Sequence, residues 1–287
     1  MIRTVEIKSI AEVMELIEDQ KYNSGIKRMR STYFYRGLPD AGYRLTTSLR
    51  MNCKHLYGEL EPAVLRAFTK YASIEDPELK DSVWRQMIIG QHHGLPTRLM
   101  DWTRSPLTAL HFAETENNFD KMDTRDSVVW RIDLSDINSH LPEKYREVLE
   151  KNHAFVFSVE SLDELVDNLA SYDADMGDNA FVCIEPPSVD QRIINQYSFF
   201  SIIPNGMKDI EGFLEKNTRD TVKYIIKKEI PWDVRDLLDQ LNINERILYP
   251  GLDGLSKSLA RHYFVKRELV LEAGFDPGDY GGHGKPD

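Results

Sequence analysis

Apolar residues recur at helical spacing in several stretches of the chain, usually next to a boundary signal. Ile10, Val13 and Ile17 fall on one face, and Ser9 precedes them as a helix N-cap with Glu12 in capping-box position. Similar signals predict helices over 59–73, 79–90, 106–116, 161–169, 232–241 and 252–264. Pro106 suits the first turn of its helix, because the N–H that proline lacks would have no partner there.

Shorter runs rich in β-branched and aromatic residues predict strands. The run 31–36 ends at a Gly-Leu-Pro turn, and the run 127–134 alternates in strand fashion. Further strands are predicted over 5–7, 180–185, 197–203, 221–230 and 246–249. The polar stretch 91–101 lies between two predicted helices and is expected to be irregular. These elements predict an α+β fold with a mixed or antiparallel β core, decorated by several helices.

The chain shows no internal repeat and no low-complexity linker. Its 287 residues fit one large domain or two small ones. We expect a single α+β domain over 1–274, with helical insertions and a core over about 31–204. The stretch 275–287 is rich in Gly, Pro and Asp and is expected to be a flexible tail.

Composition and charge limit the classes of function. The net charge of −11 repels nucleic acid and anionic membranes at long range, but it leaves room for a local basic groove. The N-terminus has no apolar run followed by a small-residue cleavage site, and no segment approaches the ~18 apolar residues of a membrane span. Cys53 and Cys183 are expected to be free thiols in a reducing compartment, so a cytoplasmic location is predicted.

The triplet Tyr35-Arg36-Gly37 closes one predicted strand and is the first candidate for a ligand site. A strand ending there would hold the Arg36 guanidinium at the rim of the sheet, where it can donate two parallel hydrogen bonds to a carboxylate or phosphate. Gly37 would allow a left-handed turn or the close approach of a ligand to the backbone. The alternative is a structural ion pair between Arg36 and one of the 47 acidic residues.

The segment 91–106 is the second candidate, with the sequence Gln-His-His-Gly-Leu-Pro-Thr-Arg-Leu-Met-Asp-Trp-Thr-Arg-Ser-Pro. It gathers polar and aromatic side chains in a predicted loop, and loops carry function disproportionately. Trp102 offers a flat face to a ring, while Thr103 and Ser105 offer hydroxyls at the start of a helix, where backbone N–H groups favour anions. The alternative roles are helix capping for Asp101 or Thr103 and a core position for Trp102.

Other catalytic motifs are absent or weak. Adjacent histidines such as His92 and His93 point to opposite faces in a strand, and no Cys or His pair follows at zinc-finger spacing, so no metal site is predicted. The chain has no Gly-x-Ser-x-Gly elbow, Walker A loop or GxGxxG motif. A third polar segment places Arg192, Asn195 and Gln196 where a loop enters an apolar strand. These side chains could reach a ligand or serve as turn residues.

Together these segments resemble the FRG family, which is named for a Phe-Arg-Gly motif. Tyr35 stands at the phenylalanine position of that motif. The stretch 91–113 is similar to the family's most distinctive segment, of the form HGLPTRLLDWT followed by a helix with small and aromatic residues, and Met100 replaces one leucine. The segment 192–199 is similar to a third family element, although Tyr197-Ser198 stands where the family has a glycine. The resemblance covers about residues 31–200.

The order of these elements is also similar to that of ADP-ribosyltransferases. There, a strand ending in aromatic-Arg-Gly is followed by a hydroxyl-bearing element that leads into a helix with Ala and Phe. The arginine holds a phosphate or ribose of NAD, the hydroxyls support the nicotinamide ribose, and a late glutamate stabilises an oxocarbenium-like transition state. The resemblance therefore implies a split sheet of the ADP-ribosyltransferase type, with NAD as a substrate and no metal.

Carried over to this chain, the resemblance assigns roles to individual residues. Arg36 would bind the dinucleotide, Thr103 or Ser105 would support the ribose, and Asp101 or Trp102 would line the nicotinamide side. No Gln/Glu-x-Glu motif precedes the strand 197–203; the uncharged Gln196 stands near its expected place, and the acids that could substitute are Asp101, Glu185 and Glu245. The predicted catalytic residues are Arg36, Asp101, Thr103 and Gln196. The predicted cofactor-binding residues are Tyr35, Arg36, Gly37, His93, Arg98, Trp102, Thr103 and Ser105.

Three functions follow as hypotheses. The first is an ADP-ribosyltransferase-like enzyme that uses NAD to modify RNA, DNA or protein, as a bacterial toxin or anti-phage defence effector with an antitoxin or chaperone as a further partner. The second is a non-catalytic nucleotide- or nucleic-acid-binding module, which the missing glutamate favours. The third is an RNA-directed nuclease toxin using His92 or His93 as acid–base; the acidic net charge disfavours its long nucleic-acid contacts.

Overall fold

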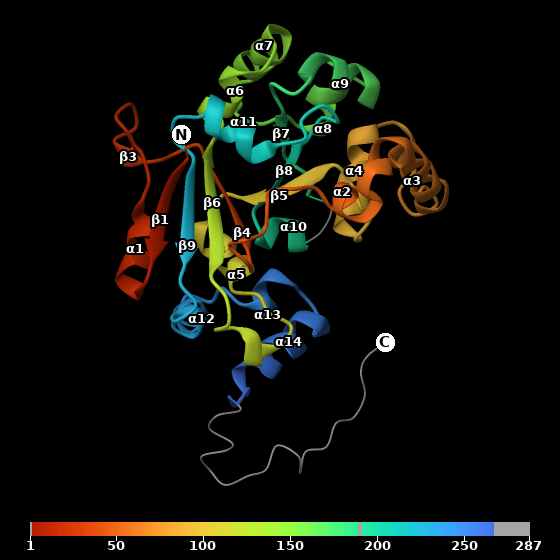
Figure 1. Cartoon of the computed structure of the whole chain (residues 1–287). Coiled ribbons are helices and arrows are strands. Elements are labelled where there is room, and N and C mark those ends of the chain that lie inside the picture. Colours follow the sequence, from red (N-terminus) through yellow and green to blue (C-terminus); the bar gives the residue numbers. More distant parts are fainter. Residues whose placement is uncertain (1, 189–190, 267–287) are drawn as a thin grey trace.

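A seven-stranded sheet runs through the centre of the molecule (Figure 1). The computed structural model describes residues 2–188 and 191–266. The strands lie in the order β1-β9-β6-β4-β5-β8-β7, with β1 and β9 parallel and the other neighbouring pairs antiparallel. Their bounds are β1 Arg3–Ile7, β4 Tyr33–Leu38, β5 Leu99–Thr103, β6 Ser127–Asp133, β7 Val182–Ile184, β8 Ser198–Ile202 and β9 Val222–Ile226. The mixed, mostly antiparallel sheet with its separate helices confirms the predicted α+β class.

The helices surround this sheet, and a small hairpin stands beside it (Figure 1). The hairpin consists of β2 Tyr22–Asn23 and β3 Arg28–Met29. The helices are α1 Ile10–Glu18, α2 Ser48–Cys53, α3 Tyr57–Ala72, α4 Val83–His92, α5 Pro106–Ala113, α6 Leu134–Ser139, α7 Glu143–Lys151, α8 Val159–Asp163, α9 Leu169–Met176, α10 Gln191–Asn195, α11 Ile210–Asn217, α12 Pro231–Gln240, α13 Glu245–Leu248 and α14 Leu252–His262. Short 3-10 turns cover η1 Lys54–Leu56, η2 Pro77–Lys80 and η3 Phe119–Lys121.

Side chains that alternate along β4 separate two of the hydrophobic cores. Tyr33 and Tyr35 face one side, where they pack with residues of α1, α5 and α12. Phe34 faces the other side and packs with Trp130 of β6 and with residues of α11. This alternation follows from the period of two residues in a strand, and it fixes which face of β4 each side chain occupies.

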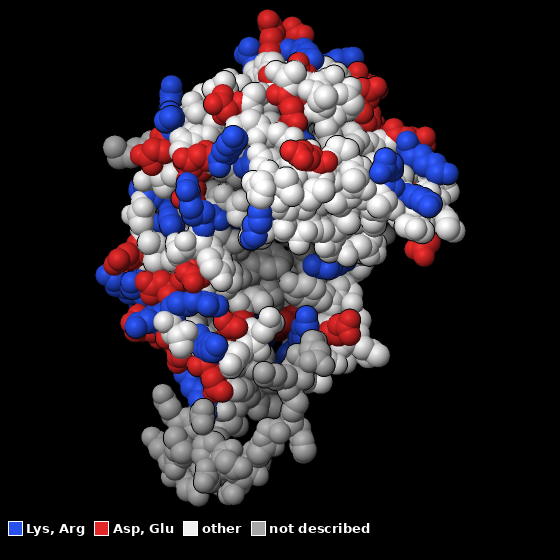
Figure 2. Space-filling view, turned by 45° about the vertical axis from the view of Figure 1, so that its right-hand side comes forward, with Lys and Arg blue, Asp and Glu red and all other residues white. Residues whose placement is uncertain are grey.

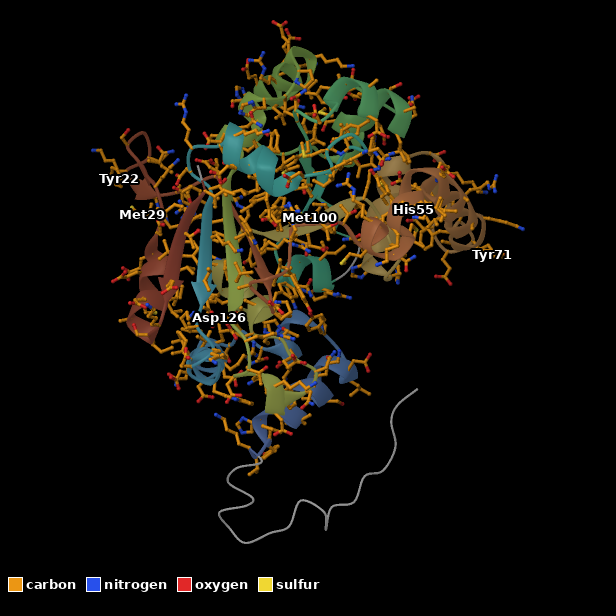
Figure 3. The ribbon with its side chains drawn as sticks, viewed as in Figure 1. Tyr22, Met29, His55, Tyr71, Met100 and Asp126 are labelled. Atoms are coloured by element: carbon orange, nitrogen blue, oxygen red, sulfur yellow. The ribbon has the colours of Figure 1, made fainter. Side chains whose placement is uncertain are left out.

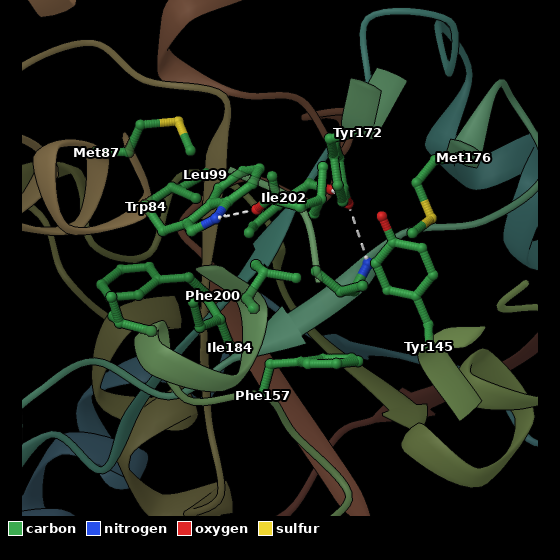
Figure 4. Packing of buried hydrophobic residues seen from close by; sticks show 14 of the residues in the cluster. Trp84, Met87, Leu99, Tyr145, Phe157, Tyr172, Met176, Ile184, Phe200 and Ile202 are labelled. Carbon is green, nitrogen blue, oxygen red and sulfur yellow. Dashed lines mark hydrogen bonds between the residues drawn. The ribbon is translucent and has the colours of Figure 1, made fainter. Parts of the chain in front are cut away.

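A third core fills the half of the sheet formed by β5, β8 and β7 (Figure 4). Residues of α4, α7, α8 and α9 pack there against the strands. The buried polar atoms are paired: the Trp84 indole donates to the Val166 carbonyl at 2.9 Å, and the Tyr172 hydroxyl donates to the Ile202 carbonyl at 2.6 Å. Met100 of β5 lies deep in the molecule, whereas Tyr71 near the end of α3 projects into solvent at the outside of the molecule (Figure 3).

Most predicted elements are present, with ends that shift by a few residues. Ser9 caps α1 as expected, because its side chain accepts a hydrogen bond from the Glu12 N–H. The Glu12 carboxylate, however, accepts from the N–H of Lys8 rather than from that of Ser9, so the predicted capping box does not close. The helix predicted over 106–116 begins at Pro106 as expected and ends at Ala113.

Three predictions of secondary structure are wrong. The predicted loop 91–101 contains the start of β5, where Leu99, Met100, Trp102 and Thr103 are buried and only Asp101 is exposed. The strand has no alternating pattern, because it is buried on both sides of Asp101, and the Gly and Pro residues just before it favour a loop. The predicted strand 246–249 is the helix α13, which the Asn244 side chain caps by accepting from the Ile247 N–H. The predicted helix 161–169 is replaced by the two separate helices α8 and α9, which are capped by the side chains of Ser158 and Asn168. The predicted tail 275–287 lies outside the described residues.

Charged side chains of both signs are interspersed over one face of the molecule (Figure 2). The chain has 36 basic and 47 acidic residues, which gives the net charge of −11. In the described residues, no helix has the length and apolar character needed to cross a membrane.

Candidate functional site

The sheet opens between β4 and β5, and a cavity of about 420 Å³ lies at this opening. Within the described part of the chain, these two strands pair only at Tyr35 and Thr103, whereas β4 pairs with β6 along its full length. Strands that separate after one pair leave room between them for a ligand. The cavity is lined by Tyr35, Arg36, Gly37, Pro39, Asp101, Trp102, Thr103, Phe112, Thr115, Asn117, Arg192, Gln196 and Ser198. We call this cavity the strand cleft.

Arg36 and Asp101 face each other across the opening. The Arg36 Nη1 donates to the Asp101 carbonyl at 2.6 Å and lies 3.4 Å from the Asp101 carboxylate. The Arg36 side chain is only 18% exposed, while that of Asp101 is 58% exposed. The predicted structural ion pair is therefore present, and the carboxylate is still reachable from the cleft.

One donor of the Arg36 guanidinium has no hydrogen-bond partner. Its Nε is buried and has no hydrogen-bond partner among the described residues. Leaving a buried donor unpaired costs about 1–3 kcal/mol, and more for a charged group. A ligand with an anionic or carbonyl oxygen could remove this cost, so Arg36 has both the charge and the free donor that a phosphate-binding residue needs.

Gln91 completes the surroundings of Asp101. Its Nε2 donates to both Asp101 carboxylate oxygens at 3.1 Å, and its Oε1 accepts from the Thr97 hydroxyl. The carboxylate is thus held in place from the α4 side by Gln91 and from the β4 side by Arg36.

Thr103 positions the third wall of the cleft. Its hydroxyl donates to the Gln196 carbonyl at 2.8 Å and accepts from the Ser105 N–H at 3.1 Å. The Gln196 amide in turn donates to the Leu248 carbonyl at 2.9 Å. These bonds connect β5 to the start of β8 and to α13. The Thr103 hydroxyl therefore holds the wall of the cleft in place, because it is already bonded to the Gln196 carbonyl and to the Ser105 N–H.

Trp102 and Tyr35 form the floor rather than a stacking platform. Trp102 is 3% exposed and its indole donates to the Ser201 hydroxyl at 3.0 Å, which matches the alternative core position. Tyr35 is 1% exposed, and its hydroxyl accepts from the Gln20 amide at 2.8 Å. Both residues line the cleft with only a small part of their surface.

Gly37 has a different role from the expected one. It continues β4 instead of forming a turn, and its φ is not in the left-handed region. A Cβ at this position would lie 1.9 Å from the Ala109 carbonyl oxygen and 2.6 Å from the Ala113 nitrogen. Glycine is required because α5 crosses β4 with its backbone in contact, and this contact holds α5 beside the cleft.

Three residues predicted to bind the cofactor do not line the cleft. The guanidinium of Arg98 is buried between the carboxylates of Glu61 and Asp173, with 2.6 Å to the latter. Ser105 caps α5 by accepting from the Thr108 N–H at 3.2 Å. His93 is the C-cap of α4, and its ring packs edge-on against that of His92 with 5.2 Å between the ring centroids. With His93 outside the lining, the histidine-based nuclease hypothesis gains no support from the cleft.

The lining also includes Thr115 and Asn117, which the sequence motifs do not mark, beside Phe112 and Arg192, which lie in segments that they do mark. Phe112, Thr115 and Asn117 line the cleft from the end of α5 and the segment after it. Arg192 approaches from α10, and its guanidinium lies over the Tyr249 ring at 5.0 Å from the centroid. No periodic signal distinguishes Thr115 and Asn117 in the sequence, because their place follows from the position of α5.

Two acids considered as substitutes for the missing glutamate lie outside the lining of the strand cleft. Glu245 pairs with Arg261 at 2.9 Å and with Arg235 at 3.3 Å, and despite burial these partners lower the pKa of its carboxyl to about 2. The Glu185 N–H donates to the Phe157 carbonyl in another part of the fold. Asp101 is therefore the one carboxylate among the described residues that line the cleft. In the described residues, no three His, Cys, Asp or Glu side chains are grouped as metal ligands would be.

The comparison with protein families finds one match, to the FRG domain, over residues 31–122. The matched part includes β4 with Arg36 and β5 with Asp101, and it ends before Arg192 and Gln196. Neither the curated proteins nor the solved structures yielded a match. Residues 31–122 are therefore similar to the FRG domain.

Proposed function

We propose that the strand cleft binds NAD and that the protein transfers ADP-ribose to a macromolecular acceptor, either nucleic acid or protein. The supporting observation is that segments far apart in the sequence line one cavity. Arg36 and Asp101 are 65 residues apart in the chain, yet both line the strand cleft together with Arg192 and Gln196. The cavity of about 420 Å³ falls in the usual range for small-molecule sites, roughly 300–1,000 Å³.

The proposed chemistry uses the two charges that face each other in the cleft. The Arg36 guanidinium would bind the pyrophosphate, with its unpaired Nε supplying a donor. When the bond between the nicotinamide nitrogen and the ribose C1′ breaks, nicotinamide leaves with the electron pair and positive charge develops on the ribose. The Asp101 carboxylate would stabilise that charge. The acceptor's nucleophile then bonds to C1′ and loses its proton to Asp101 or to water.

The direct test is incubation with labelled NAD, with free nicotinamide and labelled nucleic acid or protein measured separately. Arg36→Ala and Asp101→Asn should each reduce turnover by about 10²–10³-fold, the size of losing one preorganised electrostatic contact. The matched control is the pair Arg44–Asp209, whose charged groups lie 2.7 Å apart at an exposed surface. Arg44→Ala should leave turnover unchanged, and an Arg36→Ala protein with full turnover would end the proposal.

A non-catalytic nucleotide-binding role is the second candidate, and the state of Asp101 favours it. This carboxylate accepts hydrogen bonds from Gln91 and contacts Arg36, so part of its charge is already compensated. In this case NAD would bind and stay intact. Calorimetry would then show saturable NAD binding that Arg36→Ala weakens, while mass spectrometry detects no free nicotinamide.

A further inference from the structure

A second cavity, of about 810 Å³, adjoins the strand cleft and shares Thr115, Asn117 and Arg192 with it. Its other walls include His111 of α5, Tyr249 after α13, and Asp253 and Lys257 of α14. We call it the α14 cavity. None of the residues assigned to catalysis lines it.

His111 presents a hydrogen-bond donor without a partner. Arg235 Nη1 lies 2.9 Å from the His111 Nδ1, and a guanidinium can only donate, so Nδ1 is the unprotonated nitrogen. Burial, with the Arg235 charge acting in the same direction, lowers the pKa of His111 to about 3. The neutral ring therefore carries its proton on Nε2, which is buried and unpaired among the described residues.

The unpaired Nε2–H fits an uncharged acceptor better than a cation or a donor. A buried donor with no partner costs about 1–3 kcal/mol, and a carbonyl or ring nitrogen placed against it removes that cost. The base of a nucleotide carries such acceptors in a flat ring. The Tyr249 ring lies 6.2 Å from the His111 ring and lines the same cavity, so a flat ligand has an aromatic neighbour there.

Two cations flank the same tyrosine. The Arg192 guanidinium lies 5.0 Å and the Lys257 ammonium 5.8 Å from the Tyr249 ring centroid. Among the described residues, no carboxylate lies within ion-pair distance of Lys257. An anionic group near Tyr249 would therefore meet positive charge that is not yet neutralised.

The acidic residues of the α14 cavity are largely compensated. Glu245 is paired with Arg235 and Arg261, and Glu116 is paired with Arg125 at 2.6 Å. Burial raises the pKa of Glu114 to about 7, so this carboxyl is partly protonated near neutral pH. Asp253 is the exception, and its place in the first turn of α14 makes it a useful site for a test.

The amino end of α14 supplies further donors. The helix has 11 residues, and its N-cap Gly251 has a φ of 105° with no side-chain cap. The first N–H groups of a helix lack partners within the helix and attract anions. Pro250, Asp253 and Gly254 line the cavity at this end.

From the His111 donor, the Tyr249 ring and the cationic end formed by Lys257 and α14, we propose that the α14 cavity binds a nucleoside 5′-monophosphate. The base accepts a hydrogen bond from the His111 Nε2–H beside Tyr249. The phosphate lies at Lys257 and the amino end of α14. This site stands without the proposed transferase activity; if that activity holds, the nucleotide is either the adenylate half of NAD or part of a nucleic-acid acceptor.

Calorimetry with AMP, CMP, adenosine and ribose 5-phosphate tests the two halves of the site separately. At least one monophosphate should bind at least tenfold more tightly than both adenosine and ribose 5-phosphate, since each fragment lacks one half of the contacts. Lys257→Ala should weaken that binding about fivefold or more, and Asp253→Asn should tighten it.

The matched control is Lys70→Ala, because Lys70 also lies over a tyrosine ring, at 5.3 Å from the Tyr71 centroid on α3. Absence of saturable monophosphate binding, or equal binding by the Lys257→Ala protein, would overturn the proposal.

The position of the base has its own readout in the unmodified protein. In a sample with ¹⁵N-labelled histidine, AMP or CMP should shift the Nε2 resonance of His111 while leaving that of His140 in place, since His140 contacts the Asn217 carbonyl elsewhere in the fold. An unshifted His111 at saturating nucleotide would refute the assigned base contact. Competition then separates the two sources: NAD that displaces AMP identifies the adenylate half, and NAD that binds beside AMP identifies an acceptor nucleotide.

Discussion

At the scale of single residues, two arginines of the FRG-matching segment have opposite environments. Arg36 faces the strand cleft with an unpaired Nε, whereas the Arg98 guanidinium is 3% exposed and pairs with Glu61 and Asp173. The sequence could predict that both residues mattered, since both stand in dense polar motifs. It could not separate them, because Glu61 and Asp173 reach Arg98 from helices that lie 37 and 75 residues away in the chain.

The Arg98 pairs predict a structural rather than a binding phenotype. Arg98→Met leaves the Glu61 carboxylate buried without its partner, so the free energy of unfolding should fall by about 3–5 kcal/mol. Urea unfolding followed by circular dichroism measures this loss. Arg36→Met should cost much less stability but weaken ligand binding in the strand cleft. Weak binding with unchanged stability in the Arg98→Met protein would assign Arg98 to the site instead.

Glu114 predicts a pH-dependent stability. Burial raises the pKa of its carboxyl from 4.5 to about 7 in the folded protein, while the Ser127 hydroxyl donates to it at 2.6 Å. Between these pH values the folded state holds a proton that the unfolded chain releases, so this contribution is present below pH 4.5 and is lost as the pH rises to 7. The shift corresponds to at most about 3 kcal/mol.

The variant Glu114→Gln isolates this contribution, because an amide keeps the shape and does not ionise. Relative to the wild-type protein, the variant should gain stability between pH 5 and pH 8. The His111 ring has the opposite dependence, since its pKa is lowered, but it is present in both proteins and cancels in the difference. Urea unfolding of both proteins at the two pH values gives the comparison, and an equal difference at both would contradict the assignment.

At the scale of elements, the contact between β4 and α5 determines the wall of the cleft. Gly37→Ala would place a Cβ 1.9 Å from the Ala109 carbonyl oxygen, and backbone cannot yield as a flexible side chain does. We expect a loss of about 3 kcal/mol or more in the free energy of unfolding, at the upper end for overpacking.

The control is Gly58→Ala in α3, where the nearest atom is the Asn205 amide at 3.6 Å. That change should be neutral or stabilise by up to about 1 kcal/mol. Similar urea midpoints for the two variants would show that α5 is not held by this contact.

The elements also show where sequence patterns succeed. The amphipathic helices α1, α3 and α14 were predicted within a few residues, because their periodicity directly reflects the face that each one buries. The strand β6 was also predicted within a few residues, although all of its residues are buried. Two short elements, β5 and α13, were not predicted correctly. In β5, Asp101 interrupts a strand of five residues, and in α13 a helix of four residues is decided by the Asn244 cap. Their conformation depends on the partners β8 and α14, which local sequence does not reveal.

At the scale of the whole molecule, strand order creates the site. Arg36 lies on β4, Asp101 on β5 and Gln196 just before β8, and these strands are neighbours in the sheet although the chain inserts many helices between them. The motifs identified β4 and β5 as carriers of the site. The third polar segment marked Arg192 of α10. The contributions of α14 and of the segment after α5 follow only from how they pack around the opening, so Thr115, Asn117 and Lys257 could not be recognised from local patterns.

The two cysteines offer a test of how firmly the half of the sheet with β5, β8 and β7 is held. Cys183 on the edge strand β7 is 1% exposed, and burial raises the pKa of its thiol well above the ordinary value of 9. Cys53 at the end of α2 is only partly buried.

Because the thiolate is the reactive form, a thiol reagent should modify Cys53 in the native protein and reach Cys183 only when β7 opens. The expected count is one fast thiol per chain in buffer and two in denaturant, with Cys53→Ser removing the fast one. If Cys183 reacts as quickly as Cys53 in buffer, β7 opens freely, and the strand cleft that depends on β8 beside it is not a stable cavity.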